Sequence, residues 1–240
     1  MRVIVCENYE EMSKAGARIF AAQMTLKPDS ILGLATGSTP VGLYRELIRM
    51  NKAGEIDFAP IVSFNLDEYY PIAPDNNQSY RYFMNENLFN HVNIDKARTH
   101  VPNGMAEDAE AECKAYDAAI LAAGGIDIQL LGIGVNGHIA FNEPDGELIC
   151  GTHITGLTES TIEANSRFFA SREEVPTRAM TMGMASILGA KKIVILANGK
   201  GKHDAVKKLL DNTITTTCPA TLLKVHPDVI LICDRAAYEG

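Results

Sequence analysis

Residues 130–146 read LLGIGVNGHIAFNEPDG, an apolar run that passes into glycines and then into polar residues. The apolar run 126–133 has the length of a strand that is buried on both faces. Asn136, His138 and Glu143 follow it on a backbone that glycine makes flexible. An imidazole and a carboxylate on the loop after a buried strand are typical of the active site of an α/β protein. The segment therefore predicts an α/β fold and its catalytic loop.

The glycines of this segment, Gly132, Gly134 and Gly137, also match the dinucleotide-binding pattern G-x-G-x-x-G. That pattern requires a helix to begin at the third glycine, so that free backbone amides meet a pyrophosphate. Here Pro144 and Gly146 would stop such a helix almost as soon as it began. We therefore expect no nicotinamide cofactor at this loop.

Strand-like and helix-like segments alternate along the whole chain. This alternation predicts a mainly parallel sheet with helices on both faces, and ligands should collect at the carboxyl ends of its strands. No linker or repeat divides the chain, so we expect residues 1–240 to form one domain. The expected strands are 2–6, 30–35, 61–65, 126–133, 192–197 and 229–233, and the expected helices are 9–24, 40–50, 79–89, 107–123, 177–188 and 202–210.

The composition limits the functional classes. With 240 residues, of which 46% are hydrophobic, the chain can fill a sizeable core. A formal net charge of −8 disfavours a nucleic-acid surface, which needs clustered Lys and Arg. The first apolar stretch is too short for a secretory signal and no run is long enough to cross a membrane, so we expect a cytoplasmic protein. Five widely spaced cysteines without a C-x-x-C pair argue against disulfides and a structural zinc site.

The loop after the second expected strand reads Thr36-Gly37-Ser38-Thr39-Pro40. Its hydroxyl side chains suit a helix N-cap, and proline suits the first helical position. The free amides of that helix, with Gly37 allowing a ligand to approach the backbone, would form a phosphate-binding cradle. The alternative is a plain capped turn, and this loop alone does not decide between the two.

Two adjacent carboxylates, Asp67 and Glu68, follow the third expected strand. In isolation, such a pair is usually a solvated acidic patch. At a strand end, a partly desolvated carboxylate beside another acid has a raised pKa, which a general base needs near neutral pH. The position of the pair therefore favours a catalytic role.

Two cationic residues are candidates for holding an anion, which an acidic protein can bind only in a local cationic pocket. Arg167 stands alone before an aromatic pair, and Lys202 follows the fifth expected strand. Glycines at 199 and 201 allow a tight turn that would direct a lysine toward the crevice. Either cationic residue could instead be an ordinary surface charge.

Taken together, five segments resemble the glucosamine-6-phosphate deaminases: ATGSTP at 35–40, NLDEYY at 65–70, LLGIGVNGHIAFNEP at 130–144, ANSRFF at 164–169 and NGKGK at 198–202. The resemblance implies a Rossmann-like α/β/α sandwich. It also implies a hydrolase of amino sugar catabolism that converts glucosamine 6-phosphate and water into fructose 6-phosphate and ammonia. No metal and no organic cofactor are implied.

The resemblance further implies a role for each candidate residue. Asp67 would be the base that moves a proton from C2 of the opened sugar to C1. His138 would open the pyranose ring by moving a proton between O1 and O5, and Asn136 and Glu143 would orient the imidazole and balance its charge. The phosphate of the sugar would bind in a pocket formed by Gly37, Ser38, Thr39, Arg167 and Lys202.

Position 136 departs from the family pattern, because many members carry Asp where this chain has Asn136. An amide can accept a hydrogen bond from an imidazole, but it cannot balance the charge of an imidazolium. Glu143 would therefore be the sole carboxylate partner of His138.

The sequence leaves two other functions open. A 6-phosphogluconolactonase shares the fold and a similar glycine and histidine loop but needs no carbon base, so Asp67 and the Phe-Asn-Glu after His138 favour the deaminase. A sugar-phosphate sensor without turnover normally carries a helix-turn-helix segment, and no stretch before the first expected strand is long enough to form one. A monomer and a small homo-oligomer fit the sequence equally well.

Overall fold

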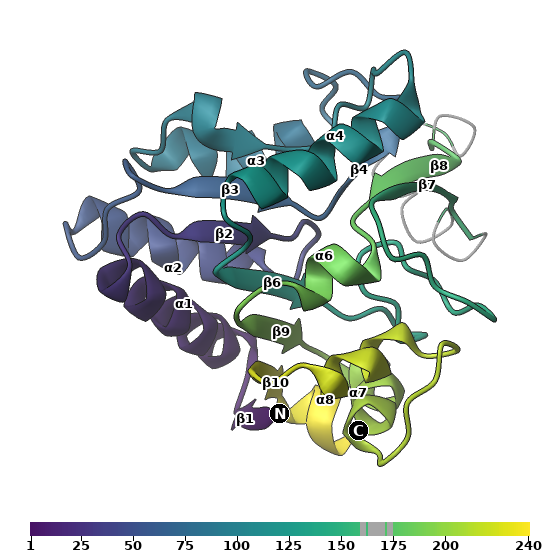
Figure 1. The fold of residues 1–240 in the computed structure, drawn as a ribbon. Coiled ribbons are helices and arrows are strands. Elements are labelled where there is room, and N and C mark those ends of the chain that lie inside the picture. Colours follow the sequence, from purple (N-terminus) through teal and green to yellow (C-terminus); the bar gives the residue numbers. More distant parts are fainter. Residues whose placement is uncertain (159–161, 163–170, 172–174) are drawn as a thin grey trace.

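The computed structural model describes residues 1–158, 162, 171 and 175–240. Within these residues, a seven-stranded sheet with parallel pairing throughout forms the centre of the molecule (Figure 1). The expected α/β fold with a mainly parallel sheet is confirmed. In spatial order the strands are β1 (Arg2–Cys6), β10 (Val229–Asp234), β9 (Ile193–Ala197), β6 (Ile128–Gly132), β2 (Ile31–Leu34), β3 (Val62–Asn65) and β5 (Thr99–His100).

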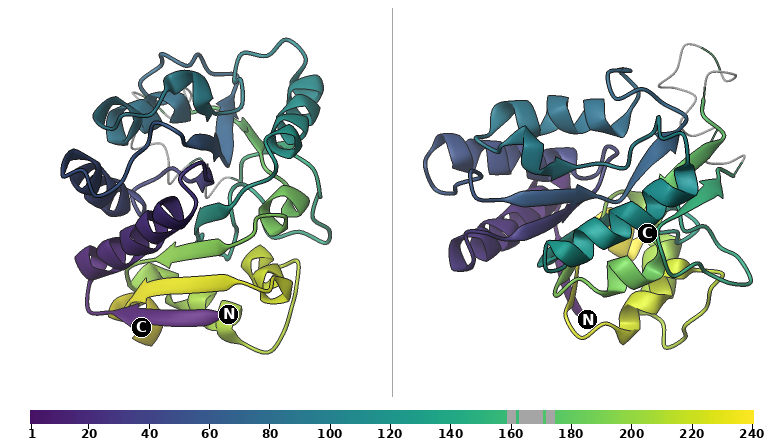
Figure 2. Two further views of the ribbon diagram at one scale, coloured as in Figure 1. Left: turned by 60° about the vertical axis from the view of Figure 1, so that its left-hand side comes forward. Right: turned by 45° about the horizontal axis from the view of Figure 1, so that its top comes forward.

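Helices cover both faces of the sheet (Figure 2). They are α1 (Tyr9–Leu26), α2 (Val41–Lys52), α3 (Tyr80–Asn87), α4 (Ala109–Ala122), α6 (Met184–Leu188), α7 (His203–Leu210) and α8 (Arg235–Glu239). Gly16 of α1 lies against Leu196 and Ile232 on one face. On the opposite face, Tyr116 of α4 packs edge-on against Phe64 with 5.7 Å between ring centroids. None of the described helices is both long and apolar enough to cross a membrane.

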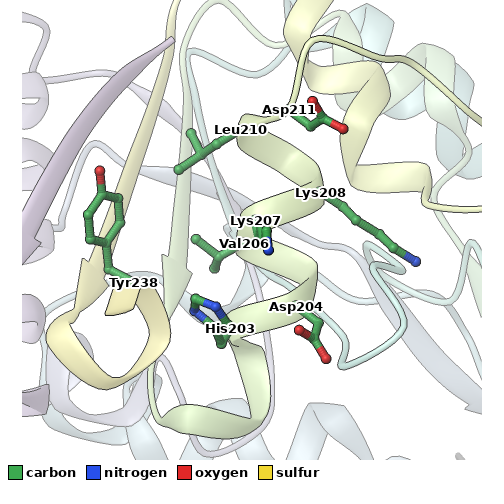
Figure 3. Close-up of a pocket in the computed structure, with 8 residues that line it drawn as sticks. All are labelled: His203, Asp204, Val206, Lys207, Lys208, Leu210, Asp211 and Tyr238. Carbon is green, nitrogen blue, oxygen red and sulfur yellow. The ribbon is translucent and has the colours of Figure 1, made fainter. Parts of the chain in front are cut away.

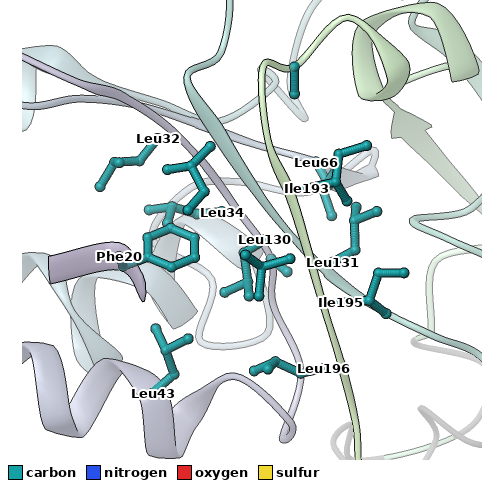
Figure 4. Packing of buried hydrophobic residues seen from close by; sticks show 14 of the residues in the cluster. Phe20, Leu32, Leu34, Leu43, Leu66, Leu130, Leu131, Ile193, Ile195 and Leu196 are labelled. Carbon is teal, nitrogen blue, oxygen red and sulfur yellow. The ribbon is translucent and has the colours of Figure 1, made fainter. Parts of the chain in front are cut away.

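The main core fills the space between the sheet and these helices (Figure 4). β9 reads IVILA and β10 reads VILICD, and every residue of both strands is buried. Strands that are covered on both faces show such continuous apolar runs. For the same reason, all six strands expected from apolar runs are confirmed, each within two residues at either end.

The strand order changes direction between β2 and β6. From β2 the chain builds outward to β3 and β5, and then it crosses to β6 and builds in the other direction through β9 to β10. β2 and β6 are paired neighbours, but the connections that follow them lead to opposite sides. A ligand commonly binds at such a switch point, beyond the carboxyl ends of the strands. The loops after β2 and β6 lie at this switch point.

A second, antiparallel sheet follows directly after β3, and it corrects one expectation. Its strands, in spatial order, are β4 (Asp67–Tyr70), β8 (Arg178–Thr181) and β7 (His153–Gly156). The helix expected over 177–188 was wrong in its first half, because residues 178–181 pair with a strand on each side. Two sets of interstrand hydrogen bonds outweigh the helix propensity of alanine and methionine. The other five expected helices are confirmed, with ends that differ by at most two residues.

Candidate active site

The loop after β6 turns back on itself, so that the ring of His138 lies against Gly134. The amide of Gly134 donates to the carbonyl of His138 at 2.9 Å, and the amide of Gly137 donates to the carbonyl of Gly134 at 3.0 Å. A Cβ at position 134 would lie about 2.5 Å from three atoms of the imidazole, so only glycine fits there. Residues 138–146 form no helix, which confirms the expectation that no helix begins at the third glycine of the motif.

Position 137 also requires glycine, but for a different reason. Its φ is +86°, in the left-handed region that favours glycine. A Cβ there would also lie 2.2 Å from Sγ of the buried Cys218. Its carbonyl accepts a hydrogen bond from the amide of Ala220 at 2.9 Å, so the loop is fastened to the segment that follows α7. The glycines of this motif therefore serve to place the imidazole.

Glu143 contacts both other polar candidates of the loop. Its Oε2 accepts a hydrogen bond from Nδ2 of Asn136 at 2.7 Å, and its Oε1 lies 3.0 Å from Nδ1 of His138. The two atoms of the second contact are not aligned as a hydrogen bond, so the contact is mainly electrostatic and strengthens when the imidazole carries a proton. Oδ1 of Asn136 accepts from the backbone amide of His138 at 3.1 Å. Asn136 thus holds the loop and the carboxylate, and the negative charge comes from Glu143.

Asp67 is the first residue of β4, and it is 6% exposed. Its carboxyl accepts no hydrogen bond from a described residue. Burial, and to a smaller extent the charge of Glu68, raise the pKa of Asp67 to about 8. A carboxyl with such a pKa accepts and releases protons near neutral pH, as a base that removes a proton from carbon must.

Glu68 is also buried, but its surroundings differ from those of Asp67. Its carboxyl accepts hydrogen bonds from the backbone amides of Tyr69, Tyr80 and Arg81 at 2.8–2.9 Å. Burial raises the pKa of Glu68 to about 7, although these amides act in the opposite direction. Of the two adjacent acids, one is therefore anchored to the protein backbone, and the other is left without a partner among the described residues.

β8 connects the segment around Asp67 with the loop of His138. Thr181 pairs with Asp67 in the antiparallel register, and its Oγ1 accepts a hydrogen bond from the amide of Phe141 at 3.0 Å. The next residue, Met182, donates its amide to the carbonyl of Leu66 at 2.7 Å. Its own carbonyl accepts from Nδ2 of Asn142 at 2.8 Å. The segments that carry Asp67 and His138 are thereby held by the same two residues, Thr181 and Met182.

The loop after β2 meets the loop after β9. Oγ1 of Thr39 donates to Oδ1 of Asn198 at 2.9 Å, and the amide of the next residue, Gly199, donates to the carboxylate of Asp234 at 3.0 Å. Lys202, farther along this loop, is half-buried and forms no ion pair with a described residue. Burial lowers the pKa of Lys202. These contacts bring two of the expected phosphate-binding segments together.

The remaining residues of the expected phosphate pocket lie as follows. Gly37 has a φ of +90° and open space around the position of a Cβ, and Ser38 is exposed beside it. The expected hydroxyl N-cap is wrong, because α2 begins at Val41 after Pro40 without a capping side chain, and Thr39 bonds Asn198 in the loop after β9 instead. Arg167 lies outside the described residues.

Sequence reasoning missed two residues that organise the site. Thr181 lies in the segment that was expected to be helical, so its place beside Asp67 was hidden. Asn198 was quoted only as part of the glycine-rich segment, although its position directly after a buried strand was a usable signal. Both residues hold two loops together.

A hollow of about 870 Å³ lies at α7 and α8 (Figure 3), but its lining includes none of the candidate residues. No group of three or more His, Cys, Asp or Glu residues in the described ranges could hold a metal ion. All five cysteines are free, which confirms that the chain has no disulfide framework.

Known proteins with similar sequences and structures support the resemblance found in the sequence. A glucosamine-6-phosphate deaminase of Clostridium perfringens (strain ATCC 13124) is 59% identical over 237 residues, which cover 99% of this chain and 98% of that protein. The deaminase of Thermoanaerobacter pseudethanolicus is 57% identical over 237 residues, covering 99% and 94%. A solved monomeric glucosamine-6-phosphate deaminase superposes with a TM-score of 0.96 at 46% identity, covering 99% of this chain and 98% of that chain.

The fold extends to more distant proteins. The 6-phosphogluconolactonase of Thermotoga maritima superposes with a TM-score of 0.78 at 20% identity, covering 98% of this chain and 99% of that chain, and it therefore shares the fold. The family model of glucosamine-6-phosphate isomerases/6-phosphogluconolactonase matches residues 8–231. The protein described here belongs to the family of glucosamine-6-phosphate isomerases and 6-phosphogluconolactonases.

Proposed function

We propose that this protein is a glucosamine-6-phosphate deaminase, which converts glucosamine 6-phosphate and water into fructose 6-phosphate and ammonia. The observation that carries the proposal is the buried carboxyl of Asp67, with its raised pKa, at the sheet edge that also holds His138 and Glu143. Opening a lactone needs no carbon base, whereas moving a proton between two carbons does. Relatives at 56–59% identity that carry the deaminase name add support.

The ring-opening step is assigned to the loop after β6. The imidazole of His138 moves a proton between O1 and O5 of the sugar, so that C1 becomes an aldehyde carbon. While the imidazole carries the proton, the carboxylate of Glu143 stabilises it, because Oε1 lies 3.0 Å from Nδ1. Asn136 supplies no charge, and its hydrogen bond to Oε2 keeps the carboxylate of Glu143 in place.

The isomerisation step is assigned to Asp67. Its carboxylate removes the proton from C2 of the open aldose while O1 takes up a proton from water, which gives an enolamine, and the carboxyl of Asp67 then returns its proton to C1. C2 is then an imine carbon, which adds water and releases ammonia. The proton transfer between carbons matches the isomerase in the family name, and the uptake of water makes the overall reaction a hydrolytic deamination. No step requires a metal or an organic cofactor.

The phosphate of the sugar is assigned to the two loops that meet at Thr39 and Asn198. Free backbone amides around Gly37 and the hydroxyl of Ser38 would contact its oxygens, and Lys202 would supply the positive charge. We keep Arg167 in the proposed phosphate pocket because the segment ANSRFF at 164–169 resembles the family. The similarity to a monomeric deaminase supports a monomer as the working assembly, and we retain the cytoplasm as the expected location.

The test is to incubate the purified protein with glucosamine 6-phosphate and with 6-phosphogluconolactone, and to measure ammonium release and lactone opening separately. The proposal expects ammonium and fructose 6-phosphate in equal amounts. Lactone opening without ammonium release would instead assign the chain to the lactonases of its family. A rise in the melting temperature with the amino sugar phosphate, without turnover of either compound, would identify a sensor.

A further inference from the structure

The N-terminus of α3 is capped by side chains from two separate segments, Glu68 and Ser79. The amides of Tyr80 and Arg81, the first two residues of the helix, donate to Oε1 and Oε2 of Glu68 at 2.8 and 2.9 Å. The amide of Tyr82 donates to Oγ of Ser79 at 3.0 Å. A helix leaves its first amides without partners and carries a partial positive charge at this end. The carboxyl of Glu68 therefore occupies a place that favours its ionised form.

Asp67 precedes Glu68 in the chain, but it has no comparable support. Both carboxyls are buried, at 6% and 2% exposure. Two buried acids in such close proximity cannot both ionise readily, so the pair tends to retain one proton near neutral pH. The member that accepts more hydrogen bonds as a carboxylate is the one that stays ionised. Glu68 accepts three from backbone amides, and Asp67 accepts none from a described residue.

We propose that Glu68 is a positioning residue for Asp67: anchored as a carboxylate on the first amides of α3, it holds a negative charge beside the base and leaves the shared proton on Asp67. This inference rests on the proposed role of Asp67 as the proton-transferring group. Its consequence is that Asp67 alternates between a neutral and an ionised form during turnover, while Glu68 remains charged. Such a division of roles follows when the surroundings of two titratable groups differ.

The other ionisable groups around Glu68 agree with this assignment. Arg81 is the nearest cation on α3, and its guanidinium donates to Oγ1 and the carbonyl of Thr99 at 2.7 and 2.8 Å. Its charge still acts on Glu68 and favours the carboxylate. The residue of β8 in register with Glu68 is Met180, which carries no charge. The phenol of Tyr80 stays neutral, because burial raises its pKa well above the ordinary value.

The described phenols near Asp67 supply no alternative source of the negative charge. Besides the phenol of Tyr80, the charge of Asp67 acts on the phenols of Tyr44 on α2 and Tyr116 on α4. Burial raises the pKa of both phenols far above neutrality, so neither of them ionises in the working range. The charge that opposes ionisation of Asp67 is therefore that of Glu68.

Anchoring Glu68 on α3 also connects the base to the loop of His138. The ring of Tyr80, the first residue of α3, stacks on the ring of Phe141 with 6.2 Å between centroids and 10° between planes. Tyr69, on the other side of Glu68, lies 4.7 Å from Tyr80 between centroids. A shift of α3 would therefore move both Glu68 and a residue of the imidazole loop.

The experiment is a carboxyl ¹³C NMR titration of the full-length protein, with Asp67 and Glu68 assigned. In the wild type, Asp67 should have the higher midpoint of the two carboxyls. In Glu68→Gln, which removes the charge but keeps an acceptor for the amides of α3, the midpoint of Asp67 should fall by about one pH unit or more. Glu112→Gln is the matched control, because Oε1 of Glu112 accepts the amide of Asn103 at 2.9 Å on a different helix, and it should leave Asp67 unchanged.

Each other outcome overturns the inference. An unmoved midpoint of Asp67 in Glu68→Gln would show that Glu68 acts only as a helix anchor, and so would a lowered melting temperature without any change in the titration. If Glu68→Gln does not fold, the wild-type titration decides alone, and a higher midpoint for Glu68 than for Asp67 contradicts the proposal. The titration needs no turnover. A wild-type protein that releases no ammonium would therefore reject the proposed function and leave this inference to be judged by NMR.

Discussion

The Cα of Gly134 faces the imidazole of His138 so closely that a methyl group and the ring cannot both be present. Gly134→Ala should therefore push the ring away from Glu143 and lower kcat about a hundredfold, since a displacement of about 1 Å can cost that much. Steady-state kinetics with glucosamine 6-phosphate measures the effect. Gly132→Ala is the matched control, because a Cβ at that position has no neighbour within 4 Å. Equal kcat values for the two variants would contradict the placement of His138 as the ring-opening group.

Lys202 is expected to hold the phosphate of the substrate. Lys202→Ala should raise KM with little change in kcat, because a charge-assisted contact of about 1.5–3 kcal/mol is lost in the ground state and the transition state alike. Lys200→Ala, in the same turn, should leave KM unchanged and serves as the control. If the two variants have the same KM, Lys202 does not belong to the phosphate pocket.

The pH dependence of the reaction should follow the ionisation of Asp67. The carboxyl must be ionised to accept a proton from C2, and burial together with the charge of Glu68 raises its pKa to about 8. The value of kcat/KM should therefore fall about tenfold for each pH unit below 8 and approach a plateau above it. A profile that stays flat down to pH 5 would mean that Asp67 is ionised throughout this range and has no raised pKa.

Asp127 stabilises the amino ends of β2 and β6, away from the site. Its buried carboxyl accepts from the amide of Ile31 at 2.8 Å and from Nζ of Lys191 at 2.7 Å, and Lys27 contacts it as well. Burial disfavours the carboxylate, but these donors outweigh burial and lower the pKa. Asp127→Asn should therefore reduce the free energy of unfolding by about 2 kcal/mol at neutral pH, measured by urea denaturation.

The pH dependence of this loss follows from the sign of the shift. A lowered pKa means that the contribution of Asp127 is present above the ordinary aspartate value of about 4 and is lost as the pH falls through the lower, folded-state value. The difference between wild type and Asp127→Asn should thus shrink in acid. Asp29→Asn, at an exposed position shortly before β2, should leave the free energy of unfolding unchanged at every pH. A difference that stays constant down to pH 2 would exclude the carboxylate as its source.

The central sheet could be predicted because each of its strands is a short apolar run, and burial on both faces leaves this signal in a single strand. β4 and β8 could not be predicted in the same way. DEYY at 67–70 and RAMT at 178–181 are strands because they pair with each other, and pairing between residues 108 to 114 positions apart leaves no local pattern. The pairing of Asp67 with Thr181 could therefore be found only from the structure.

The site was partly predictable for a related reason. The motif of His138 could be recognised from glycine spacing, because steric exclusion at Gly134 and Gly137 restricts these positions to one residue type. The different environments of Asp67 and Glu68 could not be recognised, since two of the three amides that anchor Glu68 come from α3, a dozen residues farther along the chain. Adjacent residues of the same charge look equivalent in a sequence and differ only in what surrounds them.

The most direct test of the whole account follows the proton at C2. Glucosamine 6-phosphate labelled with deuterium at C2 is incubated with wild type and with Asp67→Asn, and release of the label into water is followed by NMR, while substrate binding is checked by the rise in melting temperature. We expect the variant to bind the sugar but to release label and ammonium at least about a thousandfold more slowly than the wild type. Release of the label at the wild-type rate by Asp67→Asn would contradict the assignment of Asp67 as the base.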